Sequence, residues 1–377
     1  MEITDVHVHT VSVREVSDVA NGTQDAAIIE VETDEGIRGI GEADASPPVI
    51  EAIVNAPLSH DKSCGLKEVL VGEDPFDVER LWNEMFDKSY FYGRKGAAIC
   101  AISGVDIALW DIVGKATDKP IHKLIGGKHR EQVRAYASTL FPEDPTDTGT
   151  MRRRCEEVLE NDFTAVKFGW GGFGESYETD RELLGTARDV LGPDIDIMVD
   201  AGMVWGWDTK AAIKRTNLLD DEFDLYWMEE PVYADHIEGY ARIANACETR
   251  VVGGEEEYTV YGFSDFIERG GVDGVQPDVA RSGGITHMKK IGDLAAAHGI
   301  PLLPHGYSTD IVVGASLHVI AATQNAPLIE YCVEDSPLRW DVVAESLPAV
   351  DGYVEIPDQP GLGLSLDRDV LAEYQMS

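Results

Sequence analysis

Residues 251–259, "VVGGEEEYT", place three adjacent glutamates directly after a short apolar strand. Glutamates that follow a strand ordinarily face water, so this stretch alone predicts no function. Two other stretches share its pattern. "IDIMVDAG" ends an alternating apolar run at Asp200, and "YWMEEP" leads into Glu229 and Glu230 before Pro231 stops the strand. Acidic residues that recur at strand ends predict a common site.

The spacing of these strand ends predicts the fold. From about residue 128, short apolar strands alternate with amphipathic helical stretches, which is typical of a parallel sheet. Polar residues end seven of the strands at intervals of 23 to 33 residues: Lys167, Asp200, Glu229, Glu255, Asp278, His305 and Glu330. Each interval fits one strand and one helix. Eight such units predict an α/β fold with a (β/α)8-type, modified TIM barrel.

The first part of the chain has a different pattern of apolar and polar residues. "AAIIEVETDEGIRGIGEA" predicts a hairpin that turns at Asp34-Glu35-Gly36, with a positive φ at the glycine. From Pro75 the pattern becomes helical, and "AAICAISGVDIALWDIVGKA" is apolar on nearly every side. Asp106 and Asp111 in this stretch are expected to cap or pair. An α+β domain therefore precedes the barrel.

Composition limits the possible partners. The chain has 377 residues, and 31 Lys and Arg against 69 Asp and Glu give a net charge of −38. The negative electrostatic field of such a protein repels nucleic acid and anionic lipid. Concentrated salt would screen the repulsion among its own acids, so we predict a cytoplasm rich in salt. No leader and no apolar run of bilayer length is expected, so we predict a soluble protein. Five cysteines without CxxC spacing predict reduced, buried thiols.

Parallel strands of a closed barrel end at one mouth, where such folds carry their chemistry. Asp200, Glu229 and Glu255 would therefore converge, and three carboxylates so close together repel one another unless a cation joins them. An all-oxygen ligand set with few protein ligands suits Mg²⁺. The neighbouring Glu256 and Glu257 either orient the site or are solvated.

Two further strand ends predict proton-transfer groups. His305 follows one strand and Asp278 the preceding one, so the carboxylate can fix the tautomer of the ring and raise its basicity. Lys167 lies on an apolar strand. Beside a dication its pKa would be lowered, which suits proton transfer; the alternative is that Lys167 pairs with the acids and neutralises them.

A rival interpretation comes from "GWGGFG" at residues 169–174. This stretch matches G-x-G-x-x-G, follows a strand, precedes a helix, and has Asp194 and Asp196 about 20 residues on. It permits an NAD-dependent dehydrogenase. A nucleotide fold gives no reason for Glu229, Glu255 and His305 to recur at strand ends, so we favour a glycine-rich loop that makes room for substrate.

Taken together, these motifs resemble the enolase superfamily, specifically its mandelate racemase-like acid-sugar dehydratases. "GVDIALWDIVGKATDKPIHKLIGG" looks like part of the family's capping domain; "VDAG", "MEEP" and "GGEE" resemble its metal-ligand strands; "PDVARSGG", "PHG", "LIEY" and "PGLGL" follow in the family order. The resemblance implies an N-terminal α+β capping domain at 1–127, a barrel at 128–350 and a C-terminal segment at 351–377 that returns to the cap. It also implies Mg²⁺ at Asp200, Glu229 and Glu255, a His305–Asp278 dyad, a role for Glu330 near the substrate, and homo-oligomers, from dimer to octamer.

One departure from the family pattern bears on the reaction. The family often shows Lys-x-Lys on the second strand, whereas this chain has Lys167-Phe168-Gly169. A racemase or epimerase needs a base on each face of the α-carbon, so the missing lysine argues against that alternative. Gly202 also stands where the family often has Asn.

The sequence therefore predicts dehydration of a 2,3-dihydroxy sugar acid, aldonate or aldarate, to a 2-keto-3-deoxy acid, with Mg²⁺ and Lys167 holding the enediolate. His305 either takes the α-proton or protonates the departing hydroxyl. Substrate selection is expected in cap loops at 16–24 and 92–94. The candidate substrate contacts are Tyr92, Trp170 and Tyr307.

Overall fold

The predicted barrel is present in the computed structural model, which describes residues 1–17, 23–202 and 206–376. Its first strands pair in parallel, in chain order: β4 (Gln132–Leu140), β5 (Ala165–Gly169), β6 (Asp196–Asp200), β7 (Leu225–Glu229), β8 (Arg250–Gly253) and β9 (Gly274–Val275). The last strand, β10 (Leu328–Cys332), pairs in parallel with β4 and so returns the sheet to its start. The fold class is confirmed.

One predicted strand is irregular. The segment 300–305 joins its neighbour through isolated bridges, Val275 to Leu302 and Asp278 to His305, instead of a continuous ladder. Pro301 and Pro304 lie in this segment, and proline has no amide hydrogen to donate. The bridges still bring Asp278 and His305 side by side at the mouth of the barrel.

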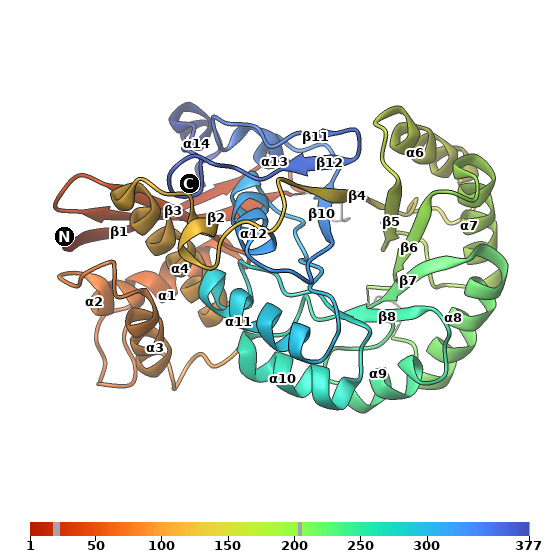
Figure 1. Cartoon of the computed structure of the whole chain (residues 1–377), viewed down its shortest axis with the longest axis horizontal. Coiled ribbons are helices and arrows are strands. Elements are labelled where there is room, and N and C mark those ends of the chain that lie inside the picture. Colours follow the sequence, from red (N-terminus) through yellow and green to blue (C-terminus); the bar gives the residue numbers. More distant parts are fainter. Residues whose placement is uncertain (18–22, 203–205, 377) are drawn as a thin grey trace.

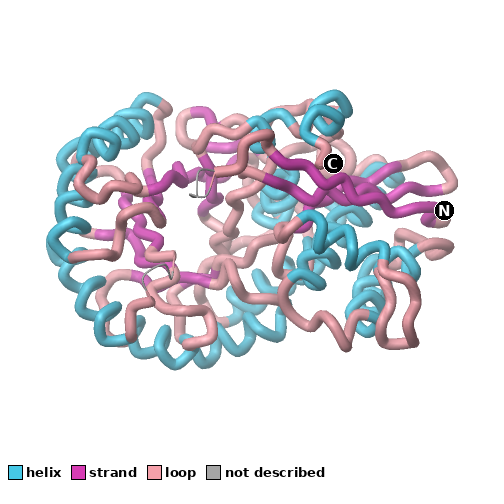
Figure 2. The backbone as a smooth tube through the Cα atoms, turned by 180° about the vertical axis from the view of Figure 1, so that it is seen from behind, coloured by secondary structure: helices cyan, strands magenta, loops and turns pink. Residues whose placement is uncertain are grey.

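Helices surround the strands on the outside, as Figures 1 and 2 show. They are α6 (Thr148–Glu160), α7 (Tyr177–Leu191), α8 (Thr209–Phe223), α9 (Ile237–Ala244), α10 (Thr259–Gly270), α11 (Gly284–Ala297) and α12 (Asp310–Ala321). Tyr136, Met198 and Trp227 belong to an apolar cluster that fills the interior between the strands. The barrel is therefore a packed core, and its chemistry is confined to the mouth.

The capping domain lies beside the barrel (Figure 1). Its antiparallel sheet is β1 (Ile3–Ser12), β2 (Asp25–Thr33) and β3 (Arg38–Ala43), followed by α1 (Pro47–Asn55), α2 (Leu66–Leu70), α3 (Val78–Lys88), α4 (Ala97–Thr117) and α5 (Ile121–Leu124). The hairpin turns at Gly36 with φ +79°, as predicted. Gly39 allows α4 to pack against the sheet, because a Cβ there would lie 2.0 Å from the Ala108 carbonyl oxygen.

Helix α4 corrects one expectation and supports another. By length and composition α4 could cross a membrane, so the prediction that no apolar run reaches that length is wrong. However, 89% of its most apolar 18-residue stretch is buried inside the protein. A core helix of a folded domain has the same composition. Asp106 joins α4 to the barrel, since it accepts hydrogen bonds from the Thr286 amide at 2.9 Å and hydroxyl at 2.6 Å. Asp111 pairs with Lys115 at 2.6 Å.

The C-terminal residues contact both domains. They form α13 (Pro337–Asp341), β11 (Ala349–Val350), β12 (Tyr353–Glu355) and α14 (Arg368–Tyr374). Strand β12 pairs antiparallel with β4, and Arg368 in α14 donates to Glu30 of the cap at 2.5 and 2.8 Å. The boundaries at 127 and 350 remain predictions.

Candidate active site

Three carboxylates meet at the mouth of the barrel. Asp200 and Glu229 are the last residues of β6 and β7, and Glu255 follows β8 by two residues. One oxygen of each lies within 4.8 Å of the others, and all three side chains are buried. Gly254 makes this possible for Glu255: it has φ +114°, and a Cβ there would lie 2.8 Å from the Phe263 ring. The double glycine in "VVGGEEEYT" is therefore a conformational requirement.

The electrostatics of the three carboxylates favour a bound cation. Burial, together with the charges of Glu229 and Glu255, raises the pKa of Asp200 well above its ordinary value. Burial also raises the pKa of Glu229, although Gln276 Nε2 donates to its Oε2 at 2.6 Å. The charge of Lys167 lowers both pKa values in part, but the net direction for each carboxyl is upward. Clustered, buried oxygen ligands fit Mg²⁺.

Lys167 lies between these ligands and the last barrel strand. Its Nζ is 2.5 Å from Glu229 Oε1, 2.8 Å from Glu330 Oε1 and 3.9 Å from Asp200 Oδ2. Burial by itself lowers the pKa of Lys167, but the carboxylates, Glu229 foremost, raise it well above its ordinary value. The predicted lowering of the Lys167 pKa applies beside a bound dication and stays a prediction, whereas the acids alone raise this pKa. The pairing alternative describes the observed contacts.

His305 and Asp278 form the expected hydrogen-bonded pair. His305 Nδ1 lies 2.6 Å from Asp278 Oδ2, while Asp278 Oδ1 accepts from the Ala280 amide at 2.6 Å. The other ring nitrogen, Nε2, lies 3.4 Å from Glu255 Oε2. Burial opposes a charged ring, but Glu255, Glu330 and the bond to Asp278 raise the pKa of His305 to about 10. The dyad is thus fixed by the backbone at one end and faces the carboxylates at the other.

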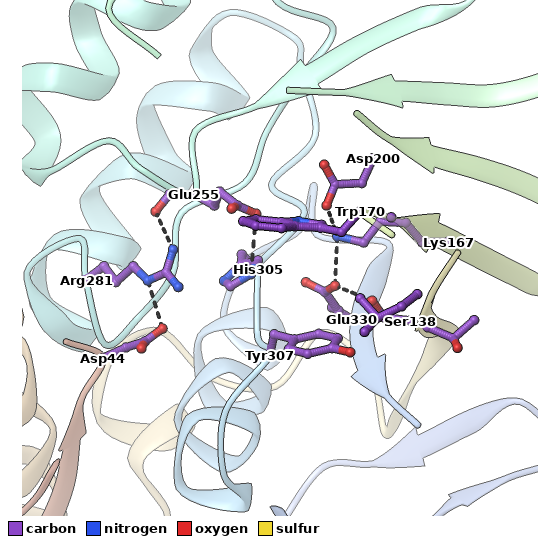
Figure 3. Close-up of a pocket in the computed structure, with 13 residues that line it drawn as sticks. Asp44, Ser138, Lys167, Trp170, Asp200, Glu255, Arg281, His305, Tyr307 and Glu330 are labelled. Atoms are coloured by element: carbon purple, nitrogen blue, oxygen red, sulfur yellow. Dashed lines mark hydrogen bonds and ion pairs between the residues drawn. The ribbon is translucent and has the colours of Figure 1, made fainter. Parts of the chain in front are cut away.

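A cavity of about 190 Å³ lies among these groups (Figure 3). Trp170 and Tyr307, two predicted substrate contacts, line it together with Lys167 and His305. Trp170 has an unusual backbone, φ +56°, and is 39% exposed. A Cβ at Gly202 would lie 2.9 Å from its indole nitrogen. The glycine that replaces the family's Asn therefore makes room for the Trp170 indole over the site.

The third predicted substrate contact, Tyr92, does not line this cavity. Its hydroxyl donates to the Cys64 carbonyl within the cap at 2.6 Å. Sequence proximity to a cap loop did not specify the direction of the side chain. Of the predicted loop at 16–24, residues 18–22 lie outside the described part of the chain. Thr23 donates to the Tyr307 carbonyl at 3.3 Å, so this end of the loop reaches the mouth.

Sequence reasoning missed several lining residues. Asp44 comes from the cap directly after β3, and Arg281 follows Asp278 by three residues; Ser138, Thr139 and Leu140 come from the end of β4. Arg281 stands in the quoted stretch "PDVARSGG", and Asp44 follows a buried strand. Neither residue belongs to the regular series of polar strand ends, so the spacing of the sequence did not single them out. Of the two other acids after β8, Glu256 pairs with Arg281 at 3.1 Å and Glu257 with Lys95 at 2.6 Å.

The glycine motif at 169–174 is packed against protein. A Cβ at Gly171 would lie 2.1 Å from the Phe141 carbonyl oxygen, and one at Gly172 would lie 2.7 Å from the Pro145 ring. Phe173 stacks on Phe141 with ring centroids 4.7 Å apart. In a dinucleotide site the glycines leave room for the pyrophosphate. Here the preceding loop fills that room, which disfavours the nicotinamide alternative.

Family comparisons agree with this geometry. A family described as "Mandelate racemase / muconate lactonizing enzyme, N-terminal domain" matches residues 3–126, and one described as "Enolase C-terminal domain-like" matches residues 150–370. The chain belongs to the enolase superfamily. This superfamily member is 35% identical to an arabinonate dehydratase of Saccharolobus solfataricus, over 96% of this chain and 93% of the relative.

Other similar proteins of the superfamily carry different names. A D-galactarolactone cycloisomerase of Agrobacterium fabrum is 34% identical, over 93% of this chain and 91% of its own. A crystal structure of a racemase from Streptomyces coelicolor A3(2) with bound magnesium has a TM-score of 0.86 and 28% identity, covering 99% of this chain and 100% of that one. The fold therefore supports several reactions, and the choice among them depends on the residues of the site.

Proposed function

We propose that this enolase-superfamily enzyme is a Mg²⁺-dependent sugar acid dehydratase, a carbon–oxygen lyase. Its substrate is a 2,3-dihydroxy carboxylate and its product a 2-keto-3-deoxy acid. One observation carries the proposal: Asp200, Glu255, Lys167 and His305 border one cavity of about 190 Å³. Glu229 completes the carboxylate cluster beside this cavity, and Asp278 bonds His305. Similarity to an arabinonate dehydratase over 96% of the chain supports the same reaction.

Asp200, Glu229 and Glu255 are the residues that would hold Mg²⁺, and the bound magnesium in the Streptomyces coelicolor structure supports this assignment. A dication there supplies Lewis-acid stabilisation of the negative charge that develops on the substrate carboxylate. Gln276 and Trp227 fix one ligand, because both donate to Glu229 Oε2, at 2.6 and 3.0 Å. Glu229 is thereby held in one orientation before any ion binds.

His305 exchanges a proton with the substrate through Nε2, the ring nitrogen that does not bond Asp278. In the overall reaction the α-hydrogen leaves as a proton, the bond from carbon 3 to its hydroxyl breaks, and the hydroxyl takes up a proton and leaves as water. His305 acts as base toward the α-carbon or as acid toward the hydroxyl. Lys167 stays charged beside Glu330, and its ammonium group stabilises the negative charge of the enediolate. Ketonisation then completes the product.

Gly169 favours dehydration over racemisation. A Cβ at this position would lie 3.0 Å from Asp200 Oδ2 and 3.1 Å from Asp200 Cβ. A side chain at this position would therefore crowd a proposed metal ligand, and Gly169 avoids that contact. Racemisation needs a base on each face of the α-carbon, and the position where the family often supplies one of them is empty of side chain.

The metal requirement tests the proposal. The purified chain is dialysed against a chelator and assayed with sugar acids before and after addition of Mg²⁺, and NADH binding is measured in parallel. We expect activity to disappear on chelation and to return with Mg²⁺, without any nicotinamide. Metal-independent turnover together with tight NADH binding would support the dehydrogenase alternative. If wild type and His305→Asn both bind Mg²⁺ but neither turns over any acid, the result would support a metal-binding protein without catalytic activity.

A further inference from the structure

The geometry of the cavity points to an aldonic acid, with one carboxylate and a neutral hydroxylated tail, as the substrate class. We propose that Asp44, held by Arg281, binds the hydroxyl groups of that tail and disfavours a second carboxylate. The inference rests on the proposed dehydratase function and narrows it, because aldonates and aldarates differ only at the end of the chain away from the reacting carbons.

Few cations around the cavity are free to bind a second substrate carboxylate. Among the described lining residues the cations are Lys167, Arg281 and His305. Lys167 is already paired with Glu229 and Glu330, and His305 with Asp278. None of these three carboxylates belongs to the substrate. A second substrate carboxylate could therefore be neutralised only by Arg281.

Arg281 is engaged as well. Its Nε donates to Asp44 Oδ2 at 2.8 Å, and its Nη1 lies 3.1 Å from Glu256 Oε1 and 3.4 Å from the Glu255 carbonyl oxygen. The side chain is only 18% exposed. Two acids thus share one guanidinium, so its charge is already balanced. A distal carboxylate would have to displace Asp44 or lie beside it unpaired.

Asp44 lies where the cap meets the mouth of the barrel. It comes from the cap, and its amide donates to the Ala280 carbonyl of the barrel at 3.3 Å. Figure 3 shows Asp44 and Arg281 on one side of His305, with Lys167 and Asp200 on the other. A substrate with its carboxyl end beside Asp200 and Lys167 and its tail across His305 would therefore reach Asp44. A carboxylate is an acceptor only, which suits hydroxyl donors and repels another carboxylate.

The cavity size agrees with a short substrate. Its volume of about 190 Å³ is below the roughly 300–1,000 Å³ of sites for drug-sized ligands. A single sugar acid is the appropriate size, and both of its ends must then contact protein. The group at the far end of the substrate therefore lies close to the charge of Asp44. At this end the enzyme can distinguish an aldonate from an aldarate.

Matched pairs of acids test the inference in the wild-type chain. Galactonate is compared with galactarate, and gluconate with glucarate, with Mg²⁺ in concentrated salt, by kcat/KM. We expect the better aldonate to exceed its aldarate partner on the order of 100-fold, mainly through KM, because like charges in a buried site cost several kcal/mol. An aldarate turned over as well as its aldonate would overturn the inference and leave the dehydratase proposal standing. No turnover of any acid would overturn both.

A variant assigns the effect to Asp44. Asp44→Asn removes the repelling charge and frees Arg281 from one partner, so the aldonate preference should shrink at least tenfold. Asp196→Asn is the matched control: Asp196 also pairs with an arginine, Arg134 at 2.8 Å, but at the opposite end of β6 from Asp200. We expect the control to keep the wild-type preference. An unchanged preference in Asp44→Asn would overturn the role of Asp44, and the wild-type comparison holds whether or not that variant folds.

Discussion

Replacing Asp278 by Asn should abolish proton transfer by reversing the tautomer of His305. The two carboxylate oxygens of Asp278 have different donors: Oδ1 accepts from the Ala280 amide and Oδ2 from His305 Nδ1, each at 2.6 Å. Asn offers one oxygen and one NH₂ group. The Ala280 amide is always a donor, so the oxygen must face it and the NH₂ group must face the ring.

The consequence for His305 follows from this orientation. An NH₂ group requires an unprotonated Nδ1 as acceptor, so the ring proton moves to Nε2. In that neutral form Nε2 cannot accept the α-proton, and without the carboxylate the ring is a weak acid toward a leaving hydroxyl. Loss of a general acid or base costs about 10²–10⁴-fold in rate, equivalent to about 2.7–5.4 kcal/mol of barrier. The reversed orientation of Asn would place two donors 2.6 Å apart and is excluded by its cost.

The assay compares kcat/KM of wild type, Asp278→Asn and His305→Asn on one sugar acid, with ¹⁵N shifts of labelled histidine to identify the tautomer. Both variants should fall by a similar factor. Mg²⁺ affinity, measured by calorimetry, should change little in Asp278→Asn, since Asp278 lies outside the cluster of Asp200, Glu229 and Glu255. If Asp278→Asn shows the reversed tautomer and still keeps more than about a tenth of wild-type kcat/KM, the reasoning is refuted.

Three further predictions concern metal, charge and salt. Lys167→Met should raise KM at least about tenfold while solvent exchange at carbon 2 in D₂O continues, because Lys167 pairs with Glu229 and Glu330; loss of exchange at unchanged KM would make it the base instead. Gly169→Ala should weaken Mg²⁺ binding about tenfold, since its Cβ would lie 3.0 Å from Asp200 Oδ2. Unchanged affinity in a metal titration would show that the Asp200 side chain can move away from the new methyl group without losing the metal. A net charge of −38 predicts that the unfolding temperature is higher in 2 M than in 0.1 M KCl, and that the predicted homo-oligomer, followed by light scattering, dissociates less in 2 M KCl; equal values at both concentrations would count against a high-salt cytoplasm.

The sequence was sufficient for the barrel because its signals are local and repeated. Alternation of strand and helix, and a polar residue at each strand end, specify which side chains reach the mouth. Asp200, Glu229 and Glu255 therefore come together as their spacing predicts. His305 and Asp278 also meet, although Pro301 and Pro304 interrupt the strand that carries the histidine.

Contacts between the cap and the barrel were not predictable in the same way. Asp44 reaches Arg281 across more than 230 residues of chain, and no periodic pattern links them. The position of Tyr92 in a cap loop does not specify where its side chain points, and its hydroxyl donates to the Cys64 carbonyl. The pKa of Lys167 depends on three carboxylates from three strands, so its direction could not be derived from its own strand. All five cysteines are free thiols as predicted, with Cys247 only partly buried.

The most direct test of the proposed dehydration is product formation from a panel of aldonic and aldaric acids. Each acid is incubated with the purified chain in concentrated salt, with Mg²⁺ or with chelator, and the mixture is followed by ¹H NMR in D₂O. The mechanism predicts that at least one acid gives a 2-keto-3-deoxy product, only when Mg²⁺ is present, and that recovered substrate keeps its configuration at carbon 2. Inversion at carbon 2 without loss of water, or product formation in chelator, would contradict it.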